Sequence, residues 1–203
     1  MNTRASPADE RCLDSRDAAA RVSITTAHYP HRDGHVALRP LSEEHLGLFV
    51  NLTTMPRVMR HIAPVLDERT AEVTFAKLLA EVRSAPPRRY VWAVRSRGDF
   101  VGIASLTDSV ENADIGIMLL PEAWDRSTAH HCVEVMLRFA FECLGKDYVT
   151  ADTRDGVNAR AISRLVQPFG FEEAPPTPGR QAWRLARPAW QARSEVAPSR
   201  QCG

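Results

Sequence analysis

The sequence predicts an α/β or α+β fold with a mixed β-sheet, and two observations support this prediction. Three strand-like segments follow one another over residues 89–120, as in an antiparallel meander. Helical and strand patterns then alternate up to residue 186, as in units with crossover connections. The 203 residues contain no internal repeat, and 44% of them are hydrophobic, so one domain with a sizeable core is expected.

The N-terminal part of this domain predicts one strand followed by helices. His35–Leu41 alternates apolar and polar residues, which is typical of a short strand. Ser42 follows as a helix N-cap, and Pro56 breaks the helical pattern that it opens. A further helix begins at Asp67 or Glu68. The apolar stripe of this helix is predicted to contain Val73, Ala76, Leu79 and Val82.

The middle of the chain predicts a hairpin and a central strand. Arg89–Arg95 and Phe100–Leu106 are rich in β-branched and aromatic residues, and Arg97–Asp99 forms the turn between them. Ala113–Leu120 is almost entirely apolar, which is typical of a strand buried inside a sheet.

The C-terminal part predicts alternating helices and strands. Ser127 or Thr128 is expected to cap a long helix that Gly145 ends. Its apolar stripe consists of Val133, Met136, Leu137, Ala140, Phe141 and Leu144. The segments that follow are a strand at Tyr148–Asp152, a helix at Ala159–Val166 and a strand at Ala182–Ala186.

Charge and cysteine content narrow the function classes. The 26 basic and 25 acidic residues give a net charge of +1, which lacks the basic excess typical of nucleic-acid-binding proteins. No secretory signal and no membrane-spanning run is visible. No CxxC pair occurs among the four cysteines, so we expect reduced thiols and a cytoplasmic protein. We expect an N-terminal extension at 1–34, the domain at 35–190 and a tail at 191–203.

Several short motifs occur in one order along this domain. They are Leu38-Arg-Pro-Leu41, Pro56-Arg-Val-Met-Arg60, Ala113-Asp-Ile-Gly-Ile117, Pro121-Glu-Ala-Trp124, Ala140-Phe141, Asn158-Ala-Arg-Ala-Ile162, Phe169-Gly-Phe171 and Trp190. This order resembles the GNAT family of acyl-CoA-dependent N-acyltransferases, and the likeness is greatest to its RimJ/RimL-like branch. The resemblance implies a GNAT-like fold, in which helices flank a central, mixed and mostly antiparallel sheet.

The resemblance also implies a site. Acetyl-CoA would be the co-substrate, and a primary amine of a small molecule or of a peptide N-terminus would be the acceptor. Asp114 occupies the position of the family's catalytic base. The implied cofactor-binding residues are Ile117, Met118 and Leu119 on the central strand, Arg126, Ser127, Thr128 and Ala129 at the pyrophosphate loop and helix start, and Asn158.

The sequence departs from the family pattern at several of these positions. Ser127 replaces the central glycine of the phosphate loop, and Asp125 adds a negative charge beside it. Ala161 and Leu165 replace hydroxyl residues that serve as general acids in family members. A catalytically impaired binding or regulatory module is therefore an alternative. An unrelated α/β domain is a third reading, and it would lack a V-shaped opening between the Asp114 and Tyr148 strands.

Other features leave the acceptor and the assembly open. Arg57 and Arg60 occur in the substrate-side segment implied by the resemblance, where they either pair with an acidic substrate or are solvated surface residues. The spacing of His28, His31 and His35 permits a metal site, but no further ligand cluster accompanies it, so no metal is expected. A homodimer is possible, and neither a nucleic acid nor a membrane is expected as a partner.

Overall fold

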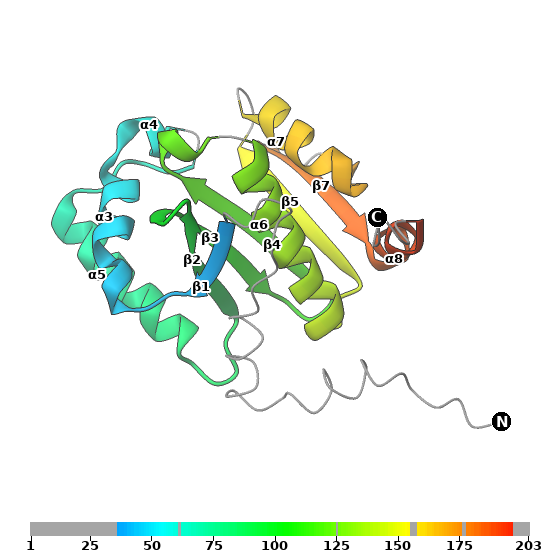
Figure 1. The fold of residues 1–203 in the computed structure, drawn as a ribbon, viewed down its shortest axis with the longest axis horizontal. Coiled ribbons are helices and arrows are strands. Elements are labelled where there is room, and N and C mark those ends of the chain that lie inside the picture. Colours follow the sequence, from blue (N-terminus) through cyan, green and yellow to red (C-terminus); the bar gives the residue numbers. More distant parts are fainter. Residues whose placement is uncertain (1–35, 61, 125, 155–157, 176–177, 197–203) are drawn as a thin grey trace.

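The computed structural model describes residues 36–196, except for residues 61, 125, 155–157 and 176–177. Its centre is a seven-stranded sheet with the strand order β1-β2-β3-β4-β5-β7-β6 (Figure 1). The strands are β1 (Val36–Pro40), β2 (Arg89–Ser96), β3 (Asp99–Asp108), β4 (Asn112–Leu119), β5 (Tyr148–Arg154), β6 (Glu172–Glu173) and β7 (Arg180–Ala186). β4 is the fourth of the seven, which confirms its predicted central place.

The sheet is mixed but mostly antiparallel. Strands β1 to β4 form a meander, and β7 runs antiparallel to both β5 and β6. Among the strands that the structure describes, only β4 and β5 pair in parallel. At the hairpin between β2 and β3, Arg97 and Gly98 both have positive φ, as a tight two-residue turn with the right-handed strand twist requires. The predicted fold class is therefore confirmed.

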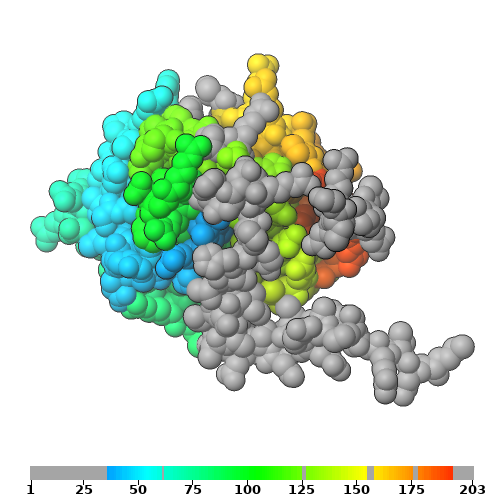
Figure 2. Space-filling view, in the orientation of Figure 1, coloured from blue at the N-terminus to red at the C-terminus, as the bar shows by residue number. Residues whose placement is uncertain are grey.

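The helices form two groups that lie beside different strands of the sheet. The helices α3 (Leu46–Thr54), α4 (Pro56–Met59) and α5 (Glu68–Val82) lie beside β1 to β3, whereas α6 (Arg126–Arg138) and α7 (Ala159–Val166) lie beside β4, β5 and β7 (Figure 1). α8 (Arg187–Val196) follows β7. Short helical turns are η2 (Glu43–His45), η3 (Pro121–Ala123), η4 (Phe139–Cys143) and η5 (Gln167–Phe169). Figure 2 shows the cyan α3–α5 region and the orange α7–β7 region on opposite sides of the molecule.

Alternation along the strands divides the core into two apolar layers. On β4, Ala113, Ile115 and Leu119 pack towards α6, together with Val133, Met136 and Leu137 of that helix. On the other face, Val91 and Ile103 pack with Phe49, Leu52, Phe75 and Leu79 of α3 and α5. From Ser105 of β3 onwards, this second face carries half-buried polar side chains: Ser105, Thr107, Asp114, Thr150 and Asp152. This polar strip borders the candidate site.

The predicted apolar stripe of α5 was partly wrong. The structure buries Ala71, Phe75 and Leu79, whereas Val73 is half exposed and Ala76 is exposed. Residues four apart lie on one helical face, and burial of the large Phe75 ring determines which face that is. Val73 lies about 200° around the helix from Phe75 and therefore faces outward.

The predicted helix after residue 126 differs at its start and in its last turn, whereas Gly145, which has a positive φ, ends it as predicted. It begins at Arg126, so Ser127 and Thr128 lie in its first turn and neither is the N-cap. The stripe from Val133 to Phe141 is buried as predicted, but the α-helix ends at Arg138 and continues as a π-helical turn. The wider turn buries three consecutive residues, Phe139, Ala140 and Phe141.

The C-terminal part of the domain contains structure that the sequence did not predict. Helix α8 continues to Val196, past Trp190, where the sequence placed the domain end. Strand β6 was not predicted; it is two residues long and both of its side chains are exposed. The predicted extension at 1–34 and residues 197–203 of the predicted tail lie outside the described residues. None of the described helices is long and apolar enough to cross a membrane.

Candidate active site

The two central strands separate from one another and leave a V-shaped gap. β4 and β5 pair only over Asn112–Asp114 and Tyr148–Thr150. β4 then continues to Leu119 while it stays paired with β3 alone. The opening expected between the Asp114 and Tyr148 strands is therefore present.

Backbone direction determines which peptide groups of β4 face this gap. The Leu120 amide donates to the Val101 carbonyl on β3 at 2.8 Å. Peptide groups alternate in direction along a strand, so those of Ile117 and Leu119 point to the opposite edge, into the gap. The Leu119 carbonyl already accepts a 2.8 Å hydrogen bond from Nε1 of Trp124. Ile117 therefore presents an N–H and a C=O to the gap.

Alternation along β4 divides the three cofactor-binding residues predicted on this strand, Ile117, Met118 and Leu119. The peptide groups of Met118 point towards β3, so only its side chain is turned to the site. Sequence reasoning missed this because it did not follow the alternation along the proposed strand.

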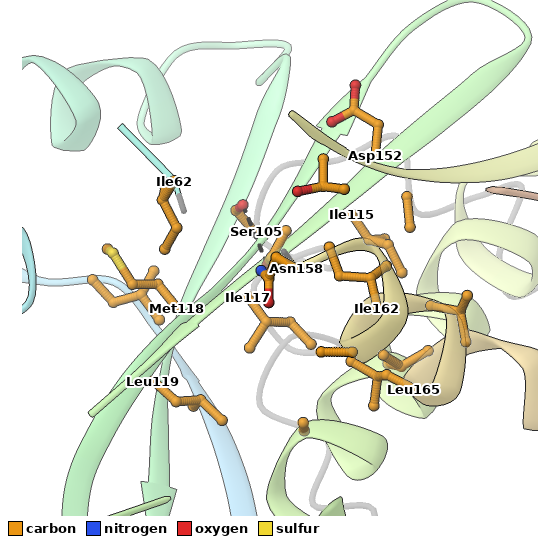
Figure 3. A pocket seen from close by; sticks show the side chains of 18 of the residues that line it. Ile62, Ser105, Ile115, Ile117, Met118, Leu119, Asp152, Asn158, Ile162 and Leu165 are labelled. Carbon is orange, nitrogen blue, oxygen red and sulfur yellow. Dashed lines mark hydrogen bonds between the residues drawn. The ribbon is translucent and has the colours of Figure 1, made fainter. Parts of the chain in front are cut away.

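A cavity of about 1220 Å³ occupies the gap and continues onto both faces of the sheet. Five of the predicted cofactor-binding residues belong to its wall: Ile117, Met118, Leu119, Ala129 and Asn158. Figure 3 shows Ile117 and Leu119 of β4 across the space from Ile162 and Leu165 of α7. Strand and helix thus form two sides of an elongated, largely apolar slot.

The first turn of α6 lies at one end of this slot. Ala129 and His130 belong to the cavity wall, whereas Ser127 is exposed and Thr128 is buried, both outside the wall. The backbone of Ser127 is helical, so no positive φ demands glycine here. The free amide groups and the positive dipole end of α6 are therefore close to this end of the slot. Asp125 and the side chain of Arg126 lie outside the described residues.

Asp114 lies where β4 and β5 separate, beside the cavity rather than in its wall. Its neighbour across the β3–β4 register, Thr107, belongs to the wall, as does Asp152 on β5. Oδ1 of Asp114 accepts a 2.8 Å hydrogen bond from the Thr150 hydroxyl. Burial raises the pKa of Asp114 to about 6. The Asp152 carboxylate adds to this rise, whereas the Thr150 hydrogen bond and the Arg180 charge oppose it.

Sequence reasoning missed the ion pair between Asp152 and Arg180. Nε of Arg180 donates to Oδ2 of Asp152 at 2.8 Å and Nη2 donates to Oδ1 at 2.5 Å. Both residues belong to the cavity wall. The available signal was alternation, since Thr150, Asp152 and Arg154 share one face of β5. Their proximity to β7 depended on the sheet order, which the sequence did not provide.

The wall of α7 that faces the cavity carries no hydroxyl group. Ala161, Ile162 and Leu165 belong to it, and Ser163 does not. Over the described residues, no group of three or more His, Cys, Asp or Glu side chains could hold a metal ion. The three histidines whose spacing permits a metal site, His28, His31 and His35, lie outside the described residues.

Comparison with known families agrees with this geometry. The family model described as an acetyltransferase (GNAT) domain matches residues 35–172. The chain belongs to the GNAT acetyltransferase family. The order of elements, the parting of β4 and β5 and the helix start beside the gap are thus features of an acetyltransferase domain. No curated protein sequence matches the chain.

Solved structures share the fold at low sequence identity. The spermidine N-acetyltransferase from Vibrio cholerae, solved with CoA and spermine, has a TM-score of 0.65 and 15% identity, with 78% of this chain and 99% of that chain covered. FdhC, a nucleotide-linked sugar GNAT, has a TM-score of 0.66 and 12% identity, with 80% and 92% covered. A GNAT-family acetyltransferase from Bacillus anthracis has a TM-score of 0.62 and 12% identity, with 76% and 96% covered. These likenesses concern the fold.

Proposed function

We propose that this protein transfers an acetyl group from acetyl-CoA to a primary amine of a small molecule or a peptide N-terminus, as a member of the RimJ/RimL-like branch. The observation that carries the proposal is the free peptide edge of Ile117 inside the gap between β4 and β5. An extended amide-containing chain can pair with such an edge as an added strand. The pantetheine arm of acetyl-CoA is a chain of this kind.

The proposed binding mode uses the residues of the slot. A pantetheine amide N–H donates to the C=O of Ile117, which leaves the Ile117 N–H free for the reacting carbonyl, while Ile162 and Leu165 cover the arm from α7. The pyrophosphate lies at the first turn of α6, where Ala129 leaves room and the helix dipole favours an anion. Asn158 precedes α7 and offers an amide side chain to the arm. The fold neighbour solved with CoA supports this choice of co-substrate.

The proposed reaction is direct attack. The amine nitrogen forms a bond to the thioester carbonyl carbon, and the oxyanion that develops accepts a hydrogen bond from the Ile117 amide. Asp114 accepts the amine proton through a bridging water, because it lies beside the cavity wall. The carbon–sulfur bond then breaks. The leaving sulfur takes a proton from solvent, since Ala161 and Leu165 offer none.

Calorimetry with acetyl-CoA and an assay of thiol release across a panel of amines test this proposal together. We expect saturable binding at micromolar to millimolar acetyl-CoA, and amine-dependent release of free CoA. Binding without release for any amine would instead support the catalytically impaired module. No heat at millimolar acetyl-CoA would contradict both readings.

A further inference from the structure

The acceptor side of the cavity carries unbalanced positive charge. This acceptor side is the part of the wall on the sheet face turned towards α3, α4 and α5, opposite the face packed against α6. Its basic side chains are Arg57, Arg60, Arg89, Arg154 and Arg180. Among the described residues, Asp152 is the one acidic side chain in the whole wall, and Arg180 holds it in an ion pair. The slot proposed for the pantetheine arm adds only Arg164 to the charged residues.

Surrounding carboxylates do not neutralise this charge. Arg89 contacts Glu81 at 3.3 Å, but both side chains are about half exposed, so the pair screens little. Arg57, Arg60 and Arg154 have no acidic partner among the described residues. Arg57, Arg60, Arg154 and Arg180 are exposed to solvent, whereas Arg89 is half-buried. Arginine charges gathered along the wall of one cavity favour an anionic occupant over a cationic one.

Arg57 is also held in place. Its guanidinium group lies 5.1 Å from the centre of the Trp124 ring. Trp124 in turn donates its Nε1 hydrogen to the Leu119 carbonyl at the end of β4. A cation over an aromatic face is attracted to it, so the ring orients Arg57 relative to the strand that carries Ile117. A planar donor fixed in this way is suited to bind a carboxylate or phosphate with two parallel hydrogen bonds.

We infer that the acceptor amine also carries an anionic group, a carboxylate or a phosphate, which Arg57 and Arg60 bind. The inference rests on the proposed function and narrows it to amines such as amino acids, acidic peptides or aminoalkyl phosphates. Polyamines are excluded as preferred acceptors, because the cavity wall offers their several cations one carboxylate, Asp152, which Arg180 already pairs with, and Asp114 beside the wall is the proposed base.

The first experiment compares acceptors matched in shape. Turnover of phenylalanine is compared with phenylalaninamide and phenethylamine, and turnover of aminoethyl phosphate with ethanolamine; spermidine is the cationic probe. We expect the anionic member of at least one pair to have a kcat/KM about ten- to a hundredfold higher. The pair that shows the preference identifies carboxylate or phosphate as the bound group. Higher turnover of spermidine or of the neutral amines overturns the inference while leaving the proposed function intact.

Substitutions assign the preference to the two arginines. Arg57→Gln and Arg60→Gln should each raise KM for the anionic amine and reduce its advantage over the neutral partner, with the Kd of acetyl-CoA unchanged. Arg69→Gln, on the exposed side of α5 and outside the cavity wall, is the matched control. An equal loss of acetyl-CoA affinity in Arg57→Gln and Arg60→Gln would place both arginines in the co-substrate site and overturn the inference.

A binding experiment keeps the inference testable without turnover. Calorimetry on the protein saturated with CoA compares the affinities of acetylated products within two matched pairs. N-acetylphenylalanine is compared with N-acetylphenethylamine, and 2-acetamidoethyl phosphate is compared with N-acetylethanolamine. We expect the anionic product of one pair to bind at least about tenfold more tightly and to lose this advantage in Arg57→Gln. Equal affinities within both pairs contradict the inference. Failure of CoA itself to bind contradicts the proposed function instead.

Discussion

The Thr150 hydroxyl donates a 2.8 Å hydrogen bond to Oδ1 of Asp114, and these two residues form the last paired position of β4 and β5. One contact therefore joins the strands at the point where they separate. It also stabilises the charged form of a carboxyl group whose burial favours the neutral form. The pKa of about 6 is the balance of these effects, and it lies close to the pH at which a general base works well.

Asp114→Asn tests this residue as the base. In the wild type, kcat/KM should rise with pH through about 6 as Asp114 loses its proton. In Asp114→Asn this limb should disappear, and kcat should fall about 100-fold with a smaller change in KM. Steady-state kinetics from pH 5 to pH 9 measure both effects, and Asp67→Asn outside the cavity wall is the control. An unchanged limb at an unchanged rate would remove Asp114 from the mechanism.

Thr150→Val should move the same limb to higher pH. The hydroxyl lowers the pKa of Asp114, so its loss raises that pKa above 6 and delays the onset of activity. Activity on the alkaline plateau should remain close to that of the wild type. Thr150→Ser keeps the donor and should restore the wild-type profile. A profile that is lowered equally at every pH would point to a packing defect.

Asp114 should also make stability depend on pH. The folded state holds this proton up to about pH 6, whereas an unfolded Asp releases it near 3.8, so the wild type loses stability as pH rises through this window. Relative to wild type, Asp114→Asn should gain up to about 3 kcal/mol in free energy of unfolding between pH 3.5 and pH 7. Urea denaturation at both values measures the change.

Asp67 provides a control of opposite sign for this experiment. It caps α5 by accepting from the Thr70 hydroxyl and amide, and these bonds lower its pKa. A lowered pKa adds stability at neutral pH that is lost on acidification. The free energy of unfolding of Asp67→Asn should therefore fall relative to that of the wild type as pH rises. The same trend in both variants would mean that Asp114 is not the source of the first effect.

Ala129→Glu tests the proposed phosphate end of the slot. The new carboxylate would stand in the cavity wall within the first turn of α6. Repulsion from the pyrophosphate should weaken acetyl-CoA binding at least about tenfold by calorimetry. Ala129→Gln has nearly the same size without charge and should have a smaller effect. Ala80→Glu on the exposed face of α5 should have none, and equal losses for Glu and Gln at position 129 would show a steric effect only.

Gly102→Ala tests whether the position of β4 matters for binding. A Cβ atom at this position would lie 2.5 Å from the Met118 carbonyl oxygen, so the backbone of β4 must move. We expect a loss of about 1–3 kcal/mol in stability and weaker acetyl-CoA binding. Gly47→Ala on α3 meets no atom within 4 Å and should be neutral or slightly stabilising. Thermal unfolding and calorimetry on both variants measure the contrast; unaltered binding in Gly102→Ala would contradict it.

Local sequence patterns predicted most elements of the fold, because turns and periodicity act over a few residues. The helix at Ala159–Val166 was predicted at its observed bounds, since Asn158 precedes it and Pro168 follows. The stripe of α6 was also predicted, because its apolar residues recur at helical spacing. The buried face of α5 was not, because several faces carried apolar residues and only packing against β2 and α3 selected Phe75.

The features of the candidate site also fall into those predicted from local sequence and those that depend on the tertiary structure. The sequence by itself identified the strand and the residues expected at the gap, since Ala113–Ile117 and Asn158–Ile162 are local motifs. Only the tertiary structure decided that the Ile117 peptide faces the gap, because this depends on the hydrogen bonding of β4 to β3. It also decided the environment of Asp114 and the gathering of arginines around one cavity. Burial and charge depend on residues far apart in the chain, which only the sheet order brings together.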